Sequence, residues 1–111
     1  MNLKRIIASL NEFREERDWR QFHNSKDLAI SISLEASELL ELFQWKDFET
    51  VQKTSLKKIE EEISDILMYC LMLSDDLDID LENAILEKLE KNKKKYPVDK
   101  SKGNSKKYTE F

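Results

Sequence analysis

Four acidic residues lie at positions where an amphipathic helix would normally carry aliphatic side chains. Glu35 and Glu38 are three positions apart within LEASELLELFQW, and Glu62 and Asp65 have the same spacing within EEEISDILMY. Positions three apart share one face of an α-helix, so each segment presents two carboxylates side by side. If the two helices pack face to face, four acidic groups converge. Oxygen ligands of this kind suit Mg²⁺, with Mn²⁺ as the alternative.

Carboxylates at this spacing repel each other, so the pattern requires a compensating charge. On a surface helix the repulsion costs roughly 0.2–0.5 kcal/mol, and the cost rises when the groups leave water. The apolar residues of the first segment spread around almost the whole helix, which predicts that Glu35 and Glu38 are largely enclosed. A metal ion or a basic side chain must then accompany them. Glu41 continues the step of three but rotates away, and we expect it at the surface or behind the ligands.

The arrangement resembles the sequence pattern of the MazG-like group, the all-α nucleoside triphosphate pyrophosphohydrolases. The two acidic pairs read Glu-x-x-Glu and Glu-x-x-Asp, with 23 residues between them. The likeness also includes, in the family's order, the blocks DWRQFH, ELFQW, EEISDILMY and KNKKKYP, and it covers roughly residues 15–109. It is greatest toward small single-domain members such as the dCTP pyrophosphatases. Glu-x-x-Glu alone is common in helices, whereas four ordered blocks are specific.

This resemblance implies Mg²⁺-dependent hydrolysis of a nucleoside triphosphate to the monophosphate and pyrophosphate. Glu35, Glu38, Glu62 and Asp65 would bind the metal, which holds the triphosphate and activates the water that attacks the α-phosphorus. Glu38, or else Glu35, would orient or deprotonate that water. The expected substrate is a dCTP-like or modified pyrimidine deoxynucleotide, and the expected role is nucleotide pool sanitation. Alternatives within the superfamily are dUTP and phosphoribosyl-ATP pyrophosphohydrolases.

The resemblance also assigns six residues to substrate binding, four to the base or sugar and two to the sugar or phosphates. They are Trp19, His23, Trp45, Tyr69, Asn92 and Lys95. Taken by themselves these residues leave structural alternatives open. The aromatic residues also suit the edge of a core, and a lysine-rich helix end complements the helix dipole. His23, the single histidine, has no Ser, Cys or Asp nearby in a pattern typical of a nucleophilic triad.

An all-α fold must position these residues. The one Gly and the one Pro both follow residue 96, and helix-forming residues are abundant. Apolar periodicity predicts four helices, with Asn24 and Asp80 as N-caps, a loop-like stretch at DWRQFH and a polar linker at 46–54. The expected helices cover 2–17, 25–43, 55–77 and 81–95. The inner face of the first is expected to comprise Leu3, Ile6, Ile7, Leu10, Phe13 and Arg17.

Length and charge divide the 111-residue chain into one domain and a tail. We expect residues 1–97 to form the helical domain and 98–111 to form a flexible basic tail able to cover the active site. Residues 1–87 hold 10 Lys/Arg against 20 Asp/Glu, whereas residues 88–107 hold 9 Lys against 2 acids. The lysines can serve a polyphosphate, although a basic run is equally typical of a solvated tail. No recognised DNA-binding module occurs, so we expect no nucleic-acid partner.

The remaining composition bears on compartment and assembly. A single cysteine, Cys70, excludes an intramolecular disulfide and fits a reducing interior. The start MNLKRIIASL is too short and polar for a signal peptide, and no run approaches 18 apolar residues, so we expect a cytoplasmic protein without membrane contact. A small core and an apolar second helix predict a four-helix bundle assembled as an oligomer. The resemblance implies that this oligomer is a homodimer or a homotetramer built as a dimer of dimers.

Other classes fit the sequence less well. An EF-hand in the segment 75–80 lacks the required Gly and the Glu at the twelfth position. A di-iron carboxylate bundle needs Glu-x-x-His pairs, and the only His lies outside both acidic segments. The rival from another functional class is a non-catalytic helical oligomer that binds nucleotide.

Overall fold

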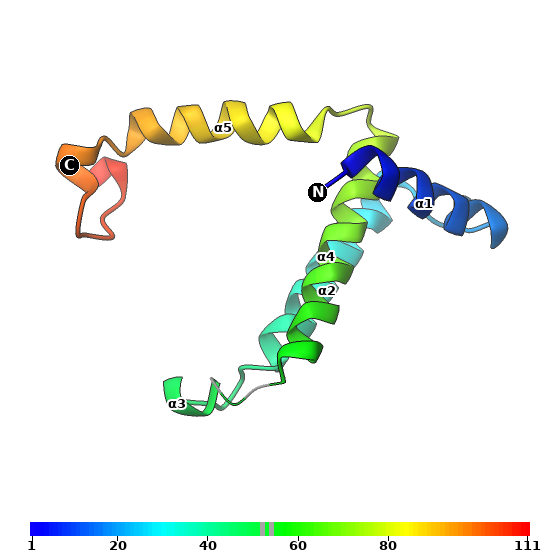
Figure 1. Cartoon of the computed structure of the whole chain (residues 1–111), viewed down its shortest axis with the longest axis horizontal. Coiled ribbons are helices and arrows are strands. Elements are labelled where there is room, and N and C mark those ends of the chain that lie inside the picture. Colours follow the sequence, from blue (N-terminus) through cyan, green and yellow to red (C-terminus); the bar gives the residue numbers. More distant parts are fainter. Residues whose placement is uncertain (52, 54) are drawn as a thin grey trace. The chain divides into compact units, whose positions relative to one another are not determined.

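Figure 1 shows the chain as a computed structural model, which describes residues 1–51, 53 and 55–111. All regular secondary structure in these residues is helical, as predicted. The α-helices are α1 (Leu3–Glu16), α2 (Ser25–Glu41), α3 (Phe48–Val51), α4 (Leu56–Asp76), α5 (Leu81–Lys95) and α6 (Val98–Ser101), followed by the 3-10 helix η1 (Tyr108–Glu110). Within this part of the chain, no helix has both the length and the apolar character needed to span a bilayer.

The four long helices confirm the predicted elements, with small differences at their ends. α2 ends at Glu41 instead of Phe43 because the next backbone bonds, such as that from Phe43 N to Leu40 O (2.9 Å), span three residues and tighten the chain into turns. The short helix α3 forms within the expected polar linker. Gln52 and Thr54 of that linker lie outside the described residues.

The chain divides into two compact units, Met1–Asp78 and Ile79–Phe111. In the second unit the ring of Tyr96, at the end of α5, packs edge-to-face against Tyr108 and Phe111 at centroid distances of 6.0 and 5.9 Å. The tail residues 98–111 therefore contain two short elements and pack against the end of their own unit. The predicted role of this tail as a cover for the active site stays a prediction.

In the first unit, α2 and α4 lie side by side along most of their length (Figure 1). Asn24 caps α2 as predicted, because its side-chain oxygen accepts a hydrogen bond from Asp27 N at 2.8 Å. Leu28 of α2 is fully buried, and Leu71 and Met72 of α4 are also buried. These buried side chains lie in the first turn of α2 and the last two turns of α4, and α4 also packs against α1. The acidic residues of the pair lie nearer the middle of their helices.

A left-handed turn after α1 directs the chain toward α2. Asp18 has φ 53°, Trp19 N donates to Arg14 O at 2.9 Å and Asp18 N donates to Glu15 O at 3.1 Å. This combination of 6→1 and 5→2 bonds is a Schellman motif, with Asp in the position that glycine usually occupies. The loop-like stretch predicted at residues 18–23 is therefore built on a defined helix end.

A buried ion pair joins α1 to α4, and the sequence analysis missed it. The Arg14 side chain is 0% exposed and donates from both terminal nitrogens to Asp76, at 3.0 and 2.9 Å. The expectation that Arg17 lies on the inner face was wrong: its side chain is 43% exposed and stacks over the Phe13 ring at 4.0 Å. The guanidinium of Arg14 can be buried because the Asp76 carboxylate accepts hydrogen bonds from both of its terminal nitrogens.

We expect Asp76→Ala to lower the free energy of unfolding by about 3–5 kcal/mol, because it leaves the enclosed Arg14 charge without a partner. Urea unfolding measures this loss. Hydrogen bonds from Arg14 hold the pKa of Asp76 below its usual value, so the stabilisation is present above the ordinary carboxyl pKa and disappears as the pH falls through the lowered one.

Asp75→Ala is the matched control, because Asp75 is exposed and its side chain accepts one hydrogen bond among the described residues, from the Asn11 side-chain amide (2.9 Å). Its effect should stay within about 0.5–1 kcal/mol. Equal losses for the two variants would contradict the special role of the buried pair.

Candidate functional site

The packing of α2 against α4 brings three of the four predicted metal ligands together. One carboxylate oxygen from each of Glu35, Glu62 and Asp65 lies within 4.8 Å of the others, and all three residues are partly buried. Glu35 comes from the middle of α2, whereas Glu62 and Asp65 are one turn apart on α4. The spacing of three within each pair thus has the geometric consequence expected from the helical repeat.

Glu38, the fourth predicted ligand, lies one turn beyond Glu35 and is exposed. It is close enough to act on the cluster, since its carboxyl group contributes to raising the pKa of both Glu35 and Glu62. Its oxygens are not part of the three-residue cluster. Glu38 therefore lies beside the cluster and is accessible to solvent.

The cluster stores unfavourable electrostatic energy. Burial, followed by hydrogen bonding to Glu38 and the charges of Glu38, Asp65 and Glu62, raises the pKa of Glu35 to about 7. Burial is also the main cause of the raised pKa of Glu62. Among the described residues, Glu35 Oε2 and Glu62 Oε2 are buried and have no hydrogen-bond partner. Two unpartnered carboxylate oxygens facing a third acid form a donor set that fits a hard divalent cation.

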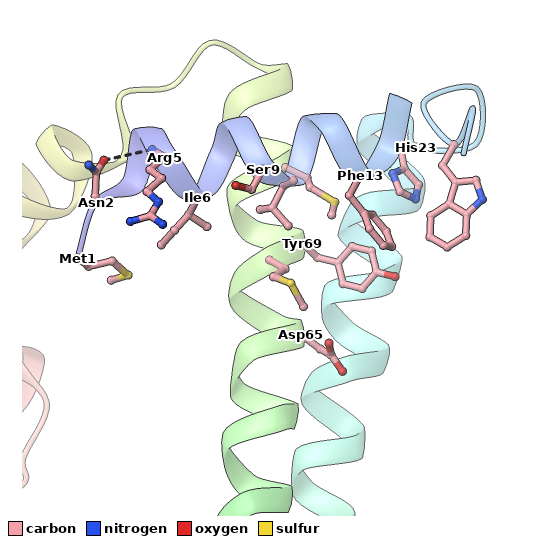
Figure 2. A pocket seen from close by; sticks show the side chains of 13 residues that line it. Met1, Asn2, Arg5, Ile6, Ser9, Phe13, His23, Asp65 and Tyr69 are labelled. Atoms are coloured by element: carbon pink, nitrogen blue, oxygen red, sulfur yellow. Dashed lines mark hydrogen bonds between the residues drawn. The ribbon is translucent and has the colours of Figure 1, made fainter. Parts of the chain in front are cut away.

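A cavity of about 660 Å³ adjoins these acids, between α1, the turn and α4 (Figure 2). Asp65 belongs both to the acidic cluster and to the cavity wall. From Asp65 the wall continues along one face of α4 through Met68, Tyr69 and Met72, at the 3, 1, 3 spacing of a helical stripe. The stripe from Asp65 to Met72 rises by about 10 Å, calculated from 1.5 Å per residue.

Four aromatic rings form a continuous edge-to-face series along the cavity. The centroids are 5.3 Å apart for Phe13 and Trp19, 6.1 Å for Trp19 and His23, and 6.3 Å for His23 and Tyr69. Such T-shaped pairs stabilise a defined ring arrangement. The series links α1, the turn and α4, so three segments together shape one apolar wall.

His23 and Tyr69 present neutral polar groups in this wall. Burial, and secondarily the Arg14 charge, lowers the pKa of His23, while burial and the charges of Glu35 and Asp65 raise the pKa of Tyr69. His23 Nδ1 is buried without a hydrogen-bond partner among the described residues. At neutral pH the imidazole and the phenol are therefore uncharged, and each can hydrogen-bond a polar ligand atom.

The other predicted substrate residues are not among those that line this cavity. Trp45 follows α2 in a left-handed conformation (φ 64°), is 94% exposed and is not among the residues that line the cavity. Asn92 and Lys95 belong to the second unit. There Lys95 Nζ lies 4.9 Å from the centroid of the Tyr108 ring and borders a shallow cavity with Lys94 and other residues. Their contacts with substrate stay predictions.

Sequence reasoning missed part of the cavity wall. Phe13 was expected only in the core, and Met68 and Met72 were not singled out, although they line the cavity. The signal was present for α4, because both methionines continue the helical stripe that begins at Asp65. For α1 the sequence had no such signal, since the hydrophobic pattern does not separate residues that fill a core from residues that border a cavity.

Known proteins are similar to this chain in sequence and in structure. A family model described as MazG-like matches residues 30–111. The chain is similar to dCTP pyrophosphatase 1 of Bos taurus (42% identity), Homo sapiens (41%) and Rattus norvegicus (38%), each over 99% of this chain and 66% of the relative. It therefore spans slightly less than two thirds of the length of these relatives.

A similar crystal structure is that of a pyrophosphatase from Archaeoglobus fulgidus DSM 4304. It is 42% identical and matches with a TM-score of 0.80 over 85% of this chain and 91% of that chain. At this identity and coverage, the likeness extends to sequence as well as to the arrangement of helices.

In the metal-free protein, we expect the free energy of unfolding to fall as the pH rises from about 4.5 to about 7. The folded state keeps a proton on Glu35 up to about pH 7, whereas the unfolded chain releases it near 4.5. The folded state therefore binds more protons within this window and loses stability as they dissociate. Urea unfolding in EDTA at several pH values measures the slope.

Glu35→Gln should reduce the dependence of the free energy of unfolding on pH. In the unsubstituted protein, saturating Mg²⁺ should restore the stability that is lost at pH 7. Glu41→Gln, an exposed substitution on the same helix, should leave the slope unchanged. An identical slope in the Glu35 and Glu41 variants would assign the titration to another group.

Proposed function

Because the chain belongs to the MazG-like family, we propose that it hydrolyses a nucleoside triphosphate between the α- and β-phosphates, giving the monophosphate and pyrophosphate. The observation that carries this proposal is the position of Asp65, which joins a cluster of acids to a cavity walled by aromatic rings. The acids suit the phosphate end of a nucleotide, and the rings suit its base. The stripe on α4, about 10 Å long, is comparable with a nucleoside and its α-phosphate.

Glu35, Glu62 and Asp65, with Glu38 beside them, would hold the divalent ion, Mg²⁺ as first choice and Mn²⁺ as the alternative. Such an ion supplies positive charge to phosphate oxygens and makes water more acidic. The unpartnered oxygens of Glu35 and Glu62 support this assignment, since a cation would satisfy both.

Glu38 is the first choice for the residue that accepts a proton from the attacking water, with Glu35 as the alternative. It is exposed next to the cluster, so it can reach water without giving up a ligand position in the three-residue group. The water oxygen forms a bond to the α-phosphorus as the bond to the bridging oxygen breaks, and pyrophosphate leaves. Lys95 and neighbouring lysines of the second unit would stabilise that leaving group.

The cavity favours a planar base with polar edges. Phe13 and Trp19 supply apolar ring surface, and neutral His23 and Tyr69 supply hydrogen-bonding groups. The names of the dCTP pyrophosphatase relatives support a dCTP-like or modified pyrimidine nucleotide, and with it a role in nucleotide pool sanitation. Asn92 would contact the sugar or phosphates.

Assembly into a homodimer or a dimer of dimers is part of the proposal. Leu34, Leu40 and Leu56 are 61, 66 and 69% exposed on α2 and α4, which is costly for large apolar side chains in water. Trp45, at 94% exposed, can wall a base pocket only if another segment covers it. A neighbouring subunit would provide that cover.

The direct test is incubation of the protein with each dNTP, dUTP and phosphoribosyl-ATP, with Mg²⁺, Mn²⁺ or EDTA. We expect release of pyrophosphate and the monophosphate in the presence of metal, with a pyrimidine deoxynucleotide preferred. If nucleotides bind but none is cleaved under any of these conditions, the protein is a non-catalytic nucleotide-binding protein and the proposed activity is wrong.

We expect Asp65→Asn to lower kcat/KM at least about a hundredfold, because substitution of groups that merely support a metal ligand already costs about ten- to a hundredfold. In EDTA the same variant should have an unchanged or higher Tm, since it relieves carboxylate repulsion. Glu61→Gln is the control, because Glu61 is exposed on the same helix and lies outside the cluster. Retained activity in Asp65→Asn would remove Asp65 from the ligand set.

A further inference from the structure

The turn between α1 and α2 carries two of the rings that form the cavity wall, Trp19 and His23. Its backbone hydrogen bonds hold it to itself and to the end of α1: Trp19 N donates to Arg14 O at 2.9 Å, and His23 N donates to Arg20 O at 3.2 Å. Tyr69, the ring that His23 meets, lies on α4. The distance between the two rings therefore depends on how the turn is held relative to α4.

Arg20, at the centre of the turn, reaches α4 directly. Its Nη1 donates to Asp76 Oδ1 at 3.2 Å, and its Nε lies 3.6 Å from Glu15 Oε1 on α1. The contact with Asp76 satisfies the distance criterion for a charge-assisted hydrogen bond, whereas the contact with Glu15 is a longer ion pair. Arg20 thus connects the middle of the turn to the last residue of α4.

The acceptor for Arg20 is held in place by other contacts. Asp76 Oδ1 and Oδ2 accept from the two terminal nitrogens of the buried Arg14 at 2.9 and 3.0 Å, and Arg14 also donates to Asn11 Oδ1 at 2.7 Å. A bidentate pair fixes the plane of the carboxylate as well as its position. Arg20 therefore binds to a rigid anchor that exists without it.

We propose that Arg20 is a positioning residue. Through its hydrogen bond to Asp76 it holds Trp19 and His23 of the turn at a fixed distance from Tyr69, and so maintains the shape of the base-binding wall. The inference rests on the proposed function only for the statement that the wall receives a base. Arg20 does not line the cavity itself, so its effect on a ligand is indirect.

Two features separate this role from a general contribution to stability. The Arg20 side chain is 43% exposed, whereas the Arg14 side chain is 0% exposed, so loss of Arg20 leaves no enclosed charge without a partner. The Schellman end of α1 also persists without Arg20, because it consists of backbone bonds. We therefore expect removal of Arg20 to loosen the turn and to leave the fold intact.

The test compares Arg20→Met, Arg20→Lys and Glu15→Gln in the full chain. Acrylamide quenching of Trp19 fluorescence, in a Trp45→Phe background that leaves one tryptophan, reports on the wall without substrate. KM and kcat for the preferred nucleotide are measured with Trp45 present, and thermal unfolding checks the fold. Glu15→Gln removes only the longer contact of Arg20 and serves as the matched control.

For Arg20→Met we expect quenching of Trp19 to rise, KM to rise about three- to fivefold and kcat to stay within about twofold, in line with the loss of a partly exposed charge pair. Arg20→Lys should retain most of the wild-type behaviour, and Glu15→Gln should match wild type. Unchanged quenching and KM in Arg20→Met would overturn the proposal, as would equal effects in Glu15→Gln. If the wild-type protein cleaves no nucleotide, the proposed function fails, and quenching alone still decides whether Arg20 positions the turn.

Discussion

Mutual repulsion among the carboxylates of Glu35, Glu62 and Asp65 is the constraint on which the rest of the structure depends. Their oxygens lie within 4.8 Å of one another, with one of these acids on α2 and two on α4. Isolated ionised acids at this distance are unfavourable, and protonation of Glu35, whose pKa is raised to about 7, is one way to relieve them. Binding of a divalent cation is the other. The pair of helices is thus built to be more stable with a positive charge than without one.

The periodicity of α4 explains how one helix contributes both to the acidic cluster and to the cavity wall. Asp65 lies at the junction, and the residues three, four and seven positions further on replace acids by Met68, Tyr69 and Met72 on the same face. A single amphipathic stripe therefore changes from charged to aromatic and thioether surface within two turns. No loop is needed to set the distance between the two ends, because a rigid helix sets it. The turn between α1 and α2 adds the rings of Trp19 and His23 to the same cavity.

The sequence was sufficient for those features that follow from local rules. The four long helices, the Asn24 and Asp80 caps and the convergence of Glu62 with Asp65 depend on residues three or four apart, and the structure has all of them. The short helices α3 and α6 were not predicted. The pairing of Arg14 with Asp76 could not be inferred, since it joins residues 62 positions apart and the sequence offers several acids as partners. For the same reason Arg17 was placed in the interior instead of Arg14. The two faces of α1 that carry Arg14 and Arg17 have similar apolar character, so tertiary packing decides which of the two arginines is buried.

Charge balance explains why the proposed site needs positive charges in addition to the acids and the metal. Three carboxylates and a polyphosphate are both strongly negative, and one divalent ion between them does not neutralise their sum. Further cations must face the phosphates that lie beyond the metal. The first 87 residues hold 10 basic against 20 acidic residues, whereas residues 88–107 hold 9 lysines against 2 acids. The acidic part of the chain therefore suits the metal of a metal–triphosphate complex, and the basic part suits its phosphates. This asymmetry is consistent with the proposal that lysines among residues 88–107 contact the leaving pyrophosphate.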